Sequence, residues 1–280
     1  MFVCLYVNMR IIFFGDIVGQ AGRQALKKVL SELKKELEPD LILANGENVA
    51  HGQGLAPKAI GEVLALGINF LTSGDHTFTL AKSEEVLSDK NIPVLRPLNW
   101  PGNVAGRGFE IIKVGTRQVL LVNLAGRVFM RHDFDDPFQK ISGLLEDYSL
   151  KGKEEGSEAV DAIILDFHAE ATSEKAALGW FLDGKVSAVL GTHTHVPTAD
   201  EKVLPRGTAF ISDLGMTGPY DSVLGADKEI VIKRFLTQKL LRMESAKGLE
   251  VEVNAVFLDI DDQTGLAQNI ARIRKIVALD

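Results

Sequence analysis

Polar residues able to bind a metal ion follow five apolar runs of the chain. The runs end in Gly15-Asp16, Asn45-Gly46-Glu47-Asn48, Gly74-Asp75-His76, Asp166-Phe167-His168 and Gly191-Thr192-His193-Thr194-His195. Four of the six histidines belong to this set. If each run is a strand of an open α/β sheet, the polar ends meet in one crevice, where such sheets bind ligands. The sequence therefore predicts one site built from five segments.

The residue types indicate which metals this site would bind. Imidazole combined with carboxylate and amide oxygens, without thiolate, suits iron, manganese or zinc rather than a structural zinc finger. His193 and His195 are expected on one face of an extended segment, because side chains repeat every two residues there. One metal needs three or four such groups, and more are present. The surplus indicates two metals sharing a bridging carboxylate, an arrangement that clamps phosphate esters for in-line attack.

Each segment alone has a simpler interpretation. A Gly-Asp pair after a strand is usually a turn, and Glu47-Asn48 fits a loop or a helix cap. His168 taken alone is more typical of a hydrogen-bonded core histidine than of a metal ligand. The occurrence of all five segments after predicted strands favours a site. His51 and His132 follow no predicted strand, so we expect them in loops or on the surface.

The elements that position these residues alternate along the first third of the chain. Strands are predicted at Arg10–Gly15, Leu41–Asn45 and Asn69–Ser73. Helices are predicted at Gly22–Glu38, at Pro57–Leu66, and after the third strand as far as about Asp89. This alternation predicts a parallel sheet with helices on both faces.

Apolar runs in the rest of the chain predict more strands. A hairpin is expected at Phe109–Val114 and Gln118–Leu124, then a helix at Pro137–Tyr148 and a charged loop at Lys151–Glu158. Further strands are expected at Ala162–Phe167, Ser187–Gly191, Ala209–Ser212 and Val251–Ile260, the last at an antiparallel edge or in a second sheet. We expect a single domain over residues 9–280. Residues 1–8 are set apart as an upstream start or an expression remnant.

Composition excludes several classes of protein. The 280 residues include 31 basic and 38 acidic side chains, and this acidic balance argues against duplex nucleic acid as a partner. No stretch approaches the roughly 18 apolar residues of a membrane span, so no membrane partner is expected. The one cysteine, Cys4, excludes an internal disulfide framework and fits a reducing, cytoplasmic compartment.

The motifs at the strand ends resemble those of a known family. The segments that carry the resemblance are GDIVGQAGR (15–23), ANGENVAHGQG (44–54), DFHAEATSEK (166–175), GTHTHVPTAD (191–200) and DLGMTGPYDSVLG (213–225). They are similar to the bacterial YmdB-like branch of the calcineurin-type metallophosphoesterases, from Met9 to roughly Ile260. The resemblance implies an α/β fold, a four-layer αββα sandwich of mixed sheets flanked by helices. It also implies a dinuclear, often iron, centre that acts on cyclic nucleotides.

Carried over by motif, the resemblance assigns metal ligands and a catalytic residue. One ion is expected on Asp16, Glu47, Asn48 and His195. Glu47 is expected to bridge to a second ion, held also by Asp75, His168 and His193. His76 corresponds to the family's catalytic histidine, beside the ions without ligating them. The implied cofactors are two divalent or trivalent ions, iron first, with manganese or zinc as alternatives.

The implied reaction is hydrolysis of a small-molecule phosphodiester, with 2',3'-cyclic nucleotides as the first choice. A hydroxide held by both ions attacks phosphorus opposite the leaving oxygen. His76 donates a proton to the leaving alkoxide or steadies the phosphate oxygens. Asp166, Asp200 and Asp213 are expected to accept hydrogen bonds from ligand imidazoles.

Position 75 departs from the family pattern, in which Gly-Asn-His is usual where this chain has Gly74-Asp75-His76. Aspartate can ligate a metal, but it adds one negative charge. A less positive centre binds phosphate less strongly. We therefore expect metal retention to be less affected than activity.

Three other functions remain open at this point. Gly15, Gly19 and Gly22 lie between a strand and a helix, but their spacing differs from the Gly-x-Gly-x-x-Gly of a nucleotide-binding module. A metal-binding regulatory protein with residual hydrolysis is the second alternative. A phosphomonoesterase or phosphoprotein phosphatase is the third. Assembly into a homo-oligomer is also open, with the Gly215–Gly225 loop as either a subunit contact or a cover for the site.

Overall fold

The computed structural model describes residues 8–50, 52–151 and 156–279. Residues 1–7, including Cys4, and His51 lie outside the described residues, so the expectations for them are not examined by the structure. Among the described residues, no helix is both long enough and apolar enough to cross a membrane.

The first sheet joins both ends of the described chain. Its strand order is β2 (Asp16–Ile17), β13 (Met216–Pro219), β14 (Glu250–Asp261), β1 (Asn8–Phe14), β3 (Leu41–Asn45) and β4 (Phe70–Thr72), with β15 (Ala267–Ala278) also paired to β14. Strands β1, β3 and β4 are parallel, as the sequence predicts. Strand β14 is antiparallel to β1, β13 and β15. The sheet is therefore mixed.

The second sheet is built from the middle of the chain. Its order is β11 (Lys202–Val203), β12 (Ala209–Ile211), β10 (Ala188–Thr192), β9 (Ala162–His168), β6 (Arg117–Ala125) and β5 (Phe109–Val114). Strands β6, β9, β10 and β12 run parallel, while β5 and β6 form the expected hairpin. A separate pair is formed by β7 (Tyr148–Leu150) and β8 (Glu158–Val160).

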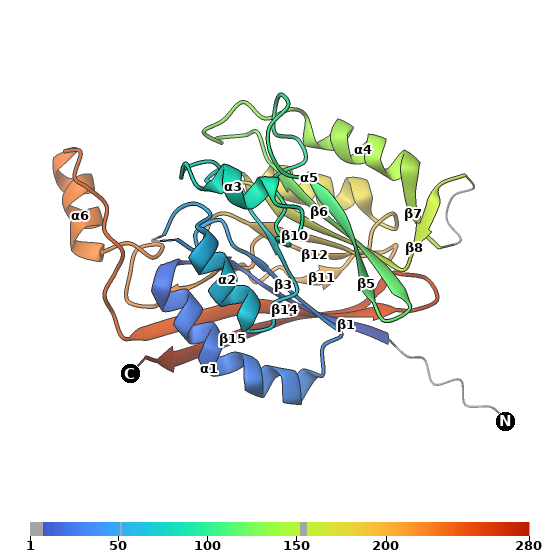
Figure 1. The fold of residues 1–280 in the computed structure, drawn as a ribbon, viewed down its shortest axis with the longest axis horizontal. Helices are drawn as coiled ribbons and strands as arrows, with labels where there is room; N and C mark the ends of the chain where they lie inside the picture. The colour runs from blue at the N-terminus through green and yellow to red at the C-terminus, as the bar shows by residue number, and fades with distance from the viewer. Residues whose placement is uncertain (1–7, 51, 152–155, 280) are drawn as a thin grey trace.

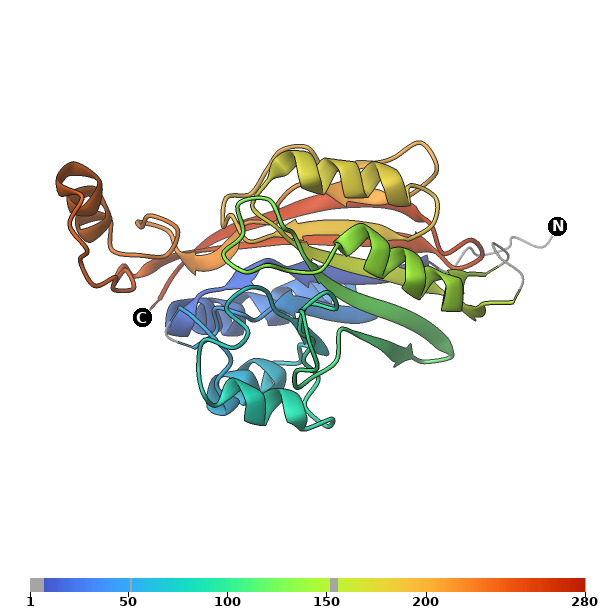
Figure 2. The ribbon, with the colours of Figure 1, turned by 90° about the horizontal axis from the view of Figure 1, so that it is seen from above.

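Helices cover the outer face of each sheet, and the two sheets face one another (Figures 1 and 2). Apolar residues of α1 (Gly19–Leu37), α2 (Pro57–Ala65) and α3 (Ser83–Ser88) pack on the first sheet. Those of α4 (Pro137–Asp147) and α5 (Thr172–Leu182) pack on the second. The expected four-layer αββα sandwich is confirmed.

The core between the sheets explains why the inner strands read as continuous apolar runs. Phe13 and Leu43 from the first sheet share one buried cluster with Ile164 and Leu190 from the second. Because the other side of each strand is buried by helices, neither face needs polar residues. This double burial fixes the strands whose carboxyl ends carry the polar segments.

Several boundaries and placements differ from those predicted from sequence. Helix α1 begins at Gly19, and only the short α3 forms before Asp89. Strand β14 is antiparallel as expected, but it is not an edge, because β15 covers its outer side. Helix α5, strand β15 and helix α6 (Lys228–Thr237) were not predicted.

Candidate metal centre

The polar segments meet where the central strands of both sheets end. Asn45 in β3 pairs with Thr72 in β4, which places the segment after β3 beside the segment after β4. His168 in β9 pairs with Thr192 in β10, which brings the segments after β9 and β10 together. The crevice predicted from the sequence is therefore formed by the facing edges of two sheets.

Four side chains converge at one point of this crevice. Glu47, Asp75, His168 and His193 each offer a ligand atom, and these atoms lie within 4.8 Å of one another. His168 Nε2 lies at the middle, 3.3 Å from Glu47 Oε2, 3.2 Å from Asp75 Oδ1 and 3.0 Å from His193 Nδ1. Two imidazoles and two carboxylates at this spacing fit a transition-metal ion or zinc.

A second group lies on the other side of Glu47. His195 Nε2 is 3.8 Å from Asp16 Oδ1 and 3.1 Å from the Asn48 amide nitrogen. Asp16 Oδ1 is buried and accepts no hydrogen bond from any described residue. A buried, unpaired carboxylate oxygen costs free energy unless a cation or another donor satisfies it. This orphaned oxygen therefore fits a second metal position beside Asn48 and His195.

The three histidines share one hydrogen-bonding arrangement. The nitrogen facing away from the centre meets an acceptor in each: His168 Nδ1 is 2.9 Å from Thr192 Oγ1, His193 Nε2 is 3.3 Å from Glu170, and His195 Nδ1 is 3.1 Å from the Leu224 carbonyl oxygen. On metal binding, the outer nitrogen can keep its proton for this acceptor while the inner nitrogen gives up its own proton and offers a lone pair to the ion. This outer arrangement is the usual one around metal-ligating histidines.

Asp166 holds the His168 ring through Thr192 rather than directly. The Thr192 hydroxyl donates to Asp166 Oδ1 at 2.7 Å, so in its 2.9 Å contact with His168 Nδ1 the threonine oxygen is the acceptor. Burial raises the pKa of Asp166 to about 6, against the opposing effects of His168 and of hydrogen bonds from Thr72, Thr192 and Asn45. The expectation of a direct Asp166–imidazole bond is wrong, because a hydroxyl stands between them.

Asp200 and Asp213 also differ from their expected role. Asp200 accepts from Ser212 and Thr198, and Asp213 forms a buried ion pair with Lys175. Neither contacts a ligand imidazole in any hydrogen bond of the described residues. Both instead fix the backbone near the histidine segment. Glu170, which does contact His193, was missed by sequence reasoning, although it lies within the DFHAEATSEK string.

Glu47, Asp75 and His168 change one another's pKa in the central cluster. Burial raises the pKa of Glu47, but the charge and hydrogen bond of His168 outweigh it and bring the pKa to about 2. Burial also opposes ionisation of Asp75, yet hydrogen bonds from His168 and His193 hold its pKa well below the usual range. Burial lowers the pKa of His168, and Glu47 and Asp75 together raise it well above the ordinary value. The carboxylates are thus ionised at neutral pH, as metal ligands must be.

Local backbone geometry makes room for this cluster. A Cβ atom at Gly74 would lie 2.3 Å from His168 Nε2 and 2.4 Å from Glu47 Oε2, so only glycine fits there. His193 and His195 both have positive φ angles, of 102° and 65°. The segment is therefore not extended, and the expected period-two placement is wrong: His193 turns to Asp75, and His195 turns to Asp16.

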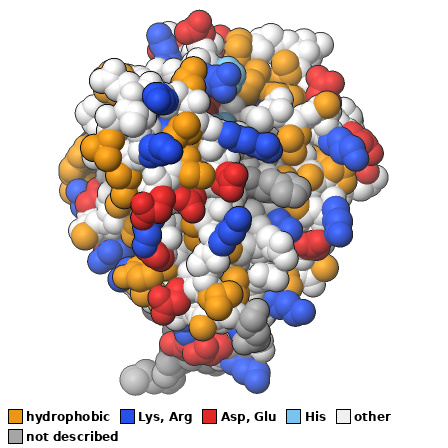
Figure 3. Space-filling model, turned by 90° about the vertical axis from the view of Figure 1, so that its left-hand side faces the viewer, with side chains coloured by type: hydrophobic (Ala, Val, Ile, Leu, Met, Phe, Trp, Pro, Cys, Tyr) orange, Lys and Arg blue, Asp and Glu red, His pale blue; other side chains and the backbone are white. Residues whose placement is uncertain are grey.

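His76 lies at the rim between the two groups. Its backbone N–H donates to Glu47 at 3.1 Å, and its ring nitrogens lie 3.5 Å from Asn48 Oδ1 and 3.7 Å from Asp75 Oδ2. The side chain is partly exposed, unlike His168. On the face shown in Figure 3, histidine side chains are visible but largely covered by their neighbours. His76 is thus placed to meet a ligand from solvent.

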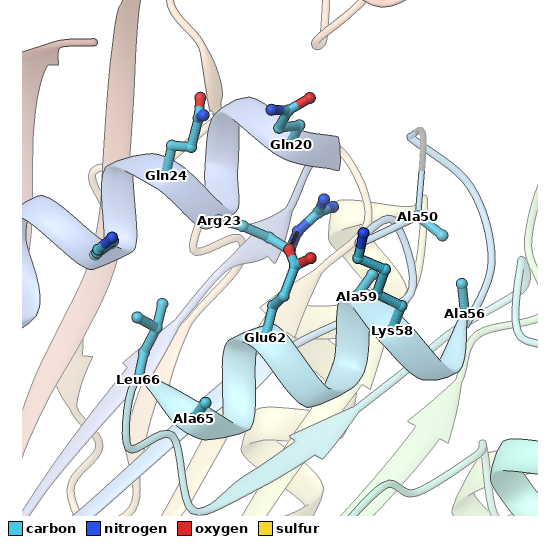
Figure 4. Close-up of a pocket in the computed structure, with 11 residues that line it drawn as sticks. Gln20, Arg23, Gln24, Ala50, Ala56, Lys58, Ala59, Glu62, Ala65 and Leu66 are labelled. Carbon is cyan, nitrogen blue, oxygen red and sulfur yellow. Dashed lines mark hydrogen bonds and ion pairs between the residues drawn. The ribbon is translucent and has the colours of Figure 1, made fainter. Parts of the chain in front are cut away.

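Three features outside the metal centre were considered for other functions: the glycines after β1, a hollow between α1 and α2, and His132. A Cβ at Gly15 would overlap the Gly215 carbonyl oxygen, and one at Gly22 would overlap that of Thr217, so close packing explains these glycines. A hollow of about 600 Å³ lies between α1 and α2, where Arg23 binds Glu62 (Figure 4). None of the residues that line this hollow is one of the candidate metal ligands. His132 lies in a loop, as expected, and its ring packs on Trp100.

Comparison with known proteins gives consistent similarities along the chain. A family model described as YmdB-like protein matches residues 12–273. A Bacillus subtilis protein named 2',3'-cyclic-nucleotide 2'-phosphodiesterase is 44% identical over 95% of this chain and 96% of its own length. A crystal structure described as a novel phosphatase from Mycoplasma pneumoniae has a TM-score of 0.88 and 34% identity, covering 98% of this chain and 96% of that one. A hypothetical protein from Thermus thermophilus gives a TM-score of 0.87 and 37% identity, covering 96% and 99%.

Proposed function

This chain belongs to the YmdB-like family, and on that premise we propose that it is a metal-dependent phosphodiesterase that hydrolyses cyclic nucleotides, 2',3'-cyclic nucleotides first. The observation that carries the proposal is the convergence of Glu47, Asp75, His168 and His193 at one point. The name of the Bacillus subtilis relative supports the substrate class.

Two metal ions are proposed as cofactors, iron first, with manganese or zinc as alternatives. Bound there, they would supply Lewis acidity toward the phosphoryl oxygens and an activated nucleophile. Glu47, Asp75, His168 and His193 would hold one ion. Asp16, Asn48 and His195 would hold the other, with Glu47 shared. Asn48 turns its amide nitrogen toward His195, so ligation through oxygen requires a half-turn of that amide.

His76 is the residue proposed to move a proton. Its ring is partly exposed, and the hydrogen bond from its backbone to Glu47 fixes its position beside the ligands. A protonated imidazole there donates to the leaving alkoxide or to a phosphate oxygen, which offsets the negative charge that develops in the reaction. Arg23 and Arg127 are bound to Glu62 and Asp136, so neither is assigned to substrate.

A phosphomonoesterase is the second candidate, because the Mycoplasma pneumoniae relative is described as a phosphatase. A substrate panel on metal-replete protein separates the two. We expect turnover of 2',3'-cyclic nucleotides to exceed that of 3',5'-cyclic nucleotides, a linear diester and a monoester. Fastest turnover of the monoester would overturn the diesterase assignment.

Turnover on the same substrates, measured together with metal content, tests the alternative that the chain is a metal-binding regulatory protein without catalysis. Glu47→Gln removes one charge from the residue proposed to be shared by both ions, so metal content and turnover should fall together. Glu62→Gln, in the hollow between α1 and α2, is the matched control and should change neither. Wild-type turnover that is indistinguishable from that of Glu47→Gln, at full metal content in the wild type, would favour the regulatory role.

The single cysteine supports a cytoplasmic location for this enzyme.

A further inference from the structure

Four aromatic rings from three different loops lie together next to the metal ligands. The Trp100 ring is at the middle, with its centroid 4.7 Å from that of Phe78, 5.2 Å from that of His132 and 5.1 Å from that of Phe134. Phe134 is buried, whereas the other three side chains are partly exposed. Phe78 lies two residues beyond His76, in the same turn. The cluster is thus connected directly to the segment that carries the proposed proton donor.

The loop that carries Trp100 is attached to a strand end of the metal centre. The preceding residue, Asn99, is buried, and its side chain donates to the Ala125 carbonyl oxygen at 2.7 Å and accepts from the Ala125 N–H at 2.9 Å. Ala125 is the last residue of β6, where it pairs with His168. The ring cluster is therefore held at the edge of the second sheet from which His168 enters the metal centre.

A hollow of about 670 Å³ lies beside the cluster, and both His132 and Phe134 line it. A cavity of this size is large enough for a small organic ligand. Arg127, which also lines the hollow, follows Gly126, whose N–H donates to the His168 carbonyl oxygen at 2.9 Å. The hollow therefore begins next to a proposed metal ligand.

The polar atoms of two of these rings are without partners in the part of the chain that the structure describes. Neither the His132 imidazole nor the Trp100 indole N–H forms a hydrogen bond or an ion pair with a described residue. Tryptophan usually finds a partner for its N–H when it is buried, and a core role for His132 would likewise occupy its ring nitrogens. Aromatic rings with free polar edges suit the flat, polar rings of nucleobases, which stack on such side chains.

We propose that His132 stacks on the nucleobase of the substrate, with Trp100 packed against it as a support. This inference rests on the proposed function, because it assigns a site to the part of a cyclic nucleotide that metal ions do not bind. Stacking accepts every base, since each has a π face. His132 would therefore favour nucleotides over other phosphodiesters without selecting one base.

The first test compares two cyclic diesters that differ only in the base. Adenosine 2',3'-cyclic phosphate carries a base, and methyl riboside 2',3'-cyclic phosphate does not. His132→Ala should lower kcat/KM for the nucleotide about 5- to 150-fold, mainly through KM, and leave the base-free diester unchanged. His132→Phe keeps an aromatic face and should retain most of the wild-type value. Phe235→Ala removes an exposed aromatic side chain of α6 and should change neither substrate.

The second test measures binding without turnover. The chain has two tryptophans, so Trp180→Phe leaves Trp100 as the reporter. In zinc-loaded protein of this background, adenosine 3'-monophosphate should change the Trp100 emission saturably, and ribose 3-phosphate should not. His132→Ala should raise the Kd of the nucleotide by the same factor as it lowers kcat/KM. Circular dichroism verifies that each variant is folded.

The outcomes separate this inference from the proposed function. Equal losses for both diesters in His132→Ala, no loss for either, or a full loss in His132→Phe would overturn base stacking and leave the phosphodiesterase assignment intact. Turnover of neither diester by wild type would overturn the proposed function, and Trp100 emission would then decide base binding alone. A saturable change with the nucleotide only would support it, and the same response to ribose 3-phosphate would overturn it.

Discussion

The ammonium group of Lys175 lies 2.7 Å from Asp213 Oδ2, and both side chains are buried. Asp213 also accepts hydrogen bonds from the backbone of Thr194 at 3.0 Å and of Gly215 at 2.8 Å. Thr194 separates the two histidines of the β10 segment. The ion pair therefore anchors a backbone that carries residues of both proposed metal positions.

Removal of the lysine charge should destabilise the fold. Lys175→Met keeps the length of the side chain but leaves Asp213 buried without its cation, a change that costs about 3–5 kcal/mol. The free energy of unfolding, measured in urea at neutral pH, checks this. Lys140→Met is the control, because Lys140 forms an exposed ion pair with Asp135, and such pairs contribute little. Equal effects of the two substitutions would contradict the structural role of the Lys175–Asp213 pair.

Thr192→Val tests the hydrogen-bond chain from Asp166 to His168. Valine has the same shape but cannot accept the His168 Nδ1–H, so the ring loses its fixed orientation. Loss of such an outer partner lowers metal affinity by about 10–100-fold. Metal content after dialysis against a graded chelator series measures the change.

Thr208→Val is the matched control, because Thr208 is a buried threonine whose hydroxyl binds the backbone carbonyl oxygen of Val186. It should reduce thermal stability without changing metal affinity. Wild-type metal affinity in Thr192→Val would show that the Asp166–Thr192–His168 chain does not support metal binding.

The sequence predicts strands best where burial on both faces makes them continuously apolar. Strands β3 and β9 are of this kind, and their boundaries were predicted to within one residue. Strand β15 was missed because Arg272, Arg274 and Lys275 interrupt an apolar pattern that is only partly buried. Helix α5 was missed because its buried positions include Lys175, which obscures an apolar face.

The candidate site was predicted as a set of segments but not in its detail. The convergence of five strand ends follows from a general property of α/β sheets. The separate directions of His193 and His195 depend on two positive φ angles, which no local pattern indicates. Thr192, Glu170 and the Leu224 carbonyl oxygen meet the histidines through tertiary packing, so sequence spacing could not identify them.

Asp75→Asn tests whether the Asp75 carboxylate is a metal ligand. Asp75 Oδ1 lies 3.2 Å from His168 Nε2 and 3.4 Å from His193 Nδ1, so this carboxylate points into the cluster. An amide oxygen is a weaker ligand, so metal affinity should fall. The centre would also gain one positive charge, so inorganic phosphate should inhibit more strongly at matched metal loading, and the pH–rate profile should shift to lower pH.

Asp135 is an exposed loop carboxylate, so Asp135→Asn should leave metal affinity, phosphate inhibition and the pH–rate profile unchanged. If Asp75→Asn retained the metal affinity and phosphate inhibition of wild type, Asp75 would not be a ligand. The aspartate at position 75 would then have no effect on metal binding at the centre.

The most direct measurement of the central claim is anomalous scattering from crystals of metal-replete protein. We predict two peaks per chain, one among Asp75, His168 and His193 and the other beside Asp16 and His195, with Glu47 between them. A single peak, or none, at full metal supply would contradict a dinuclear centre.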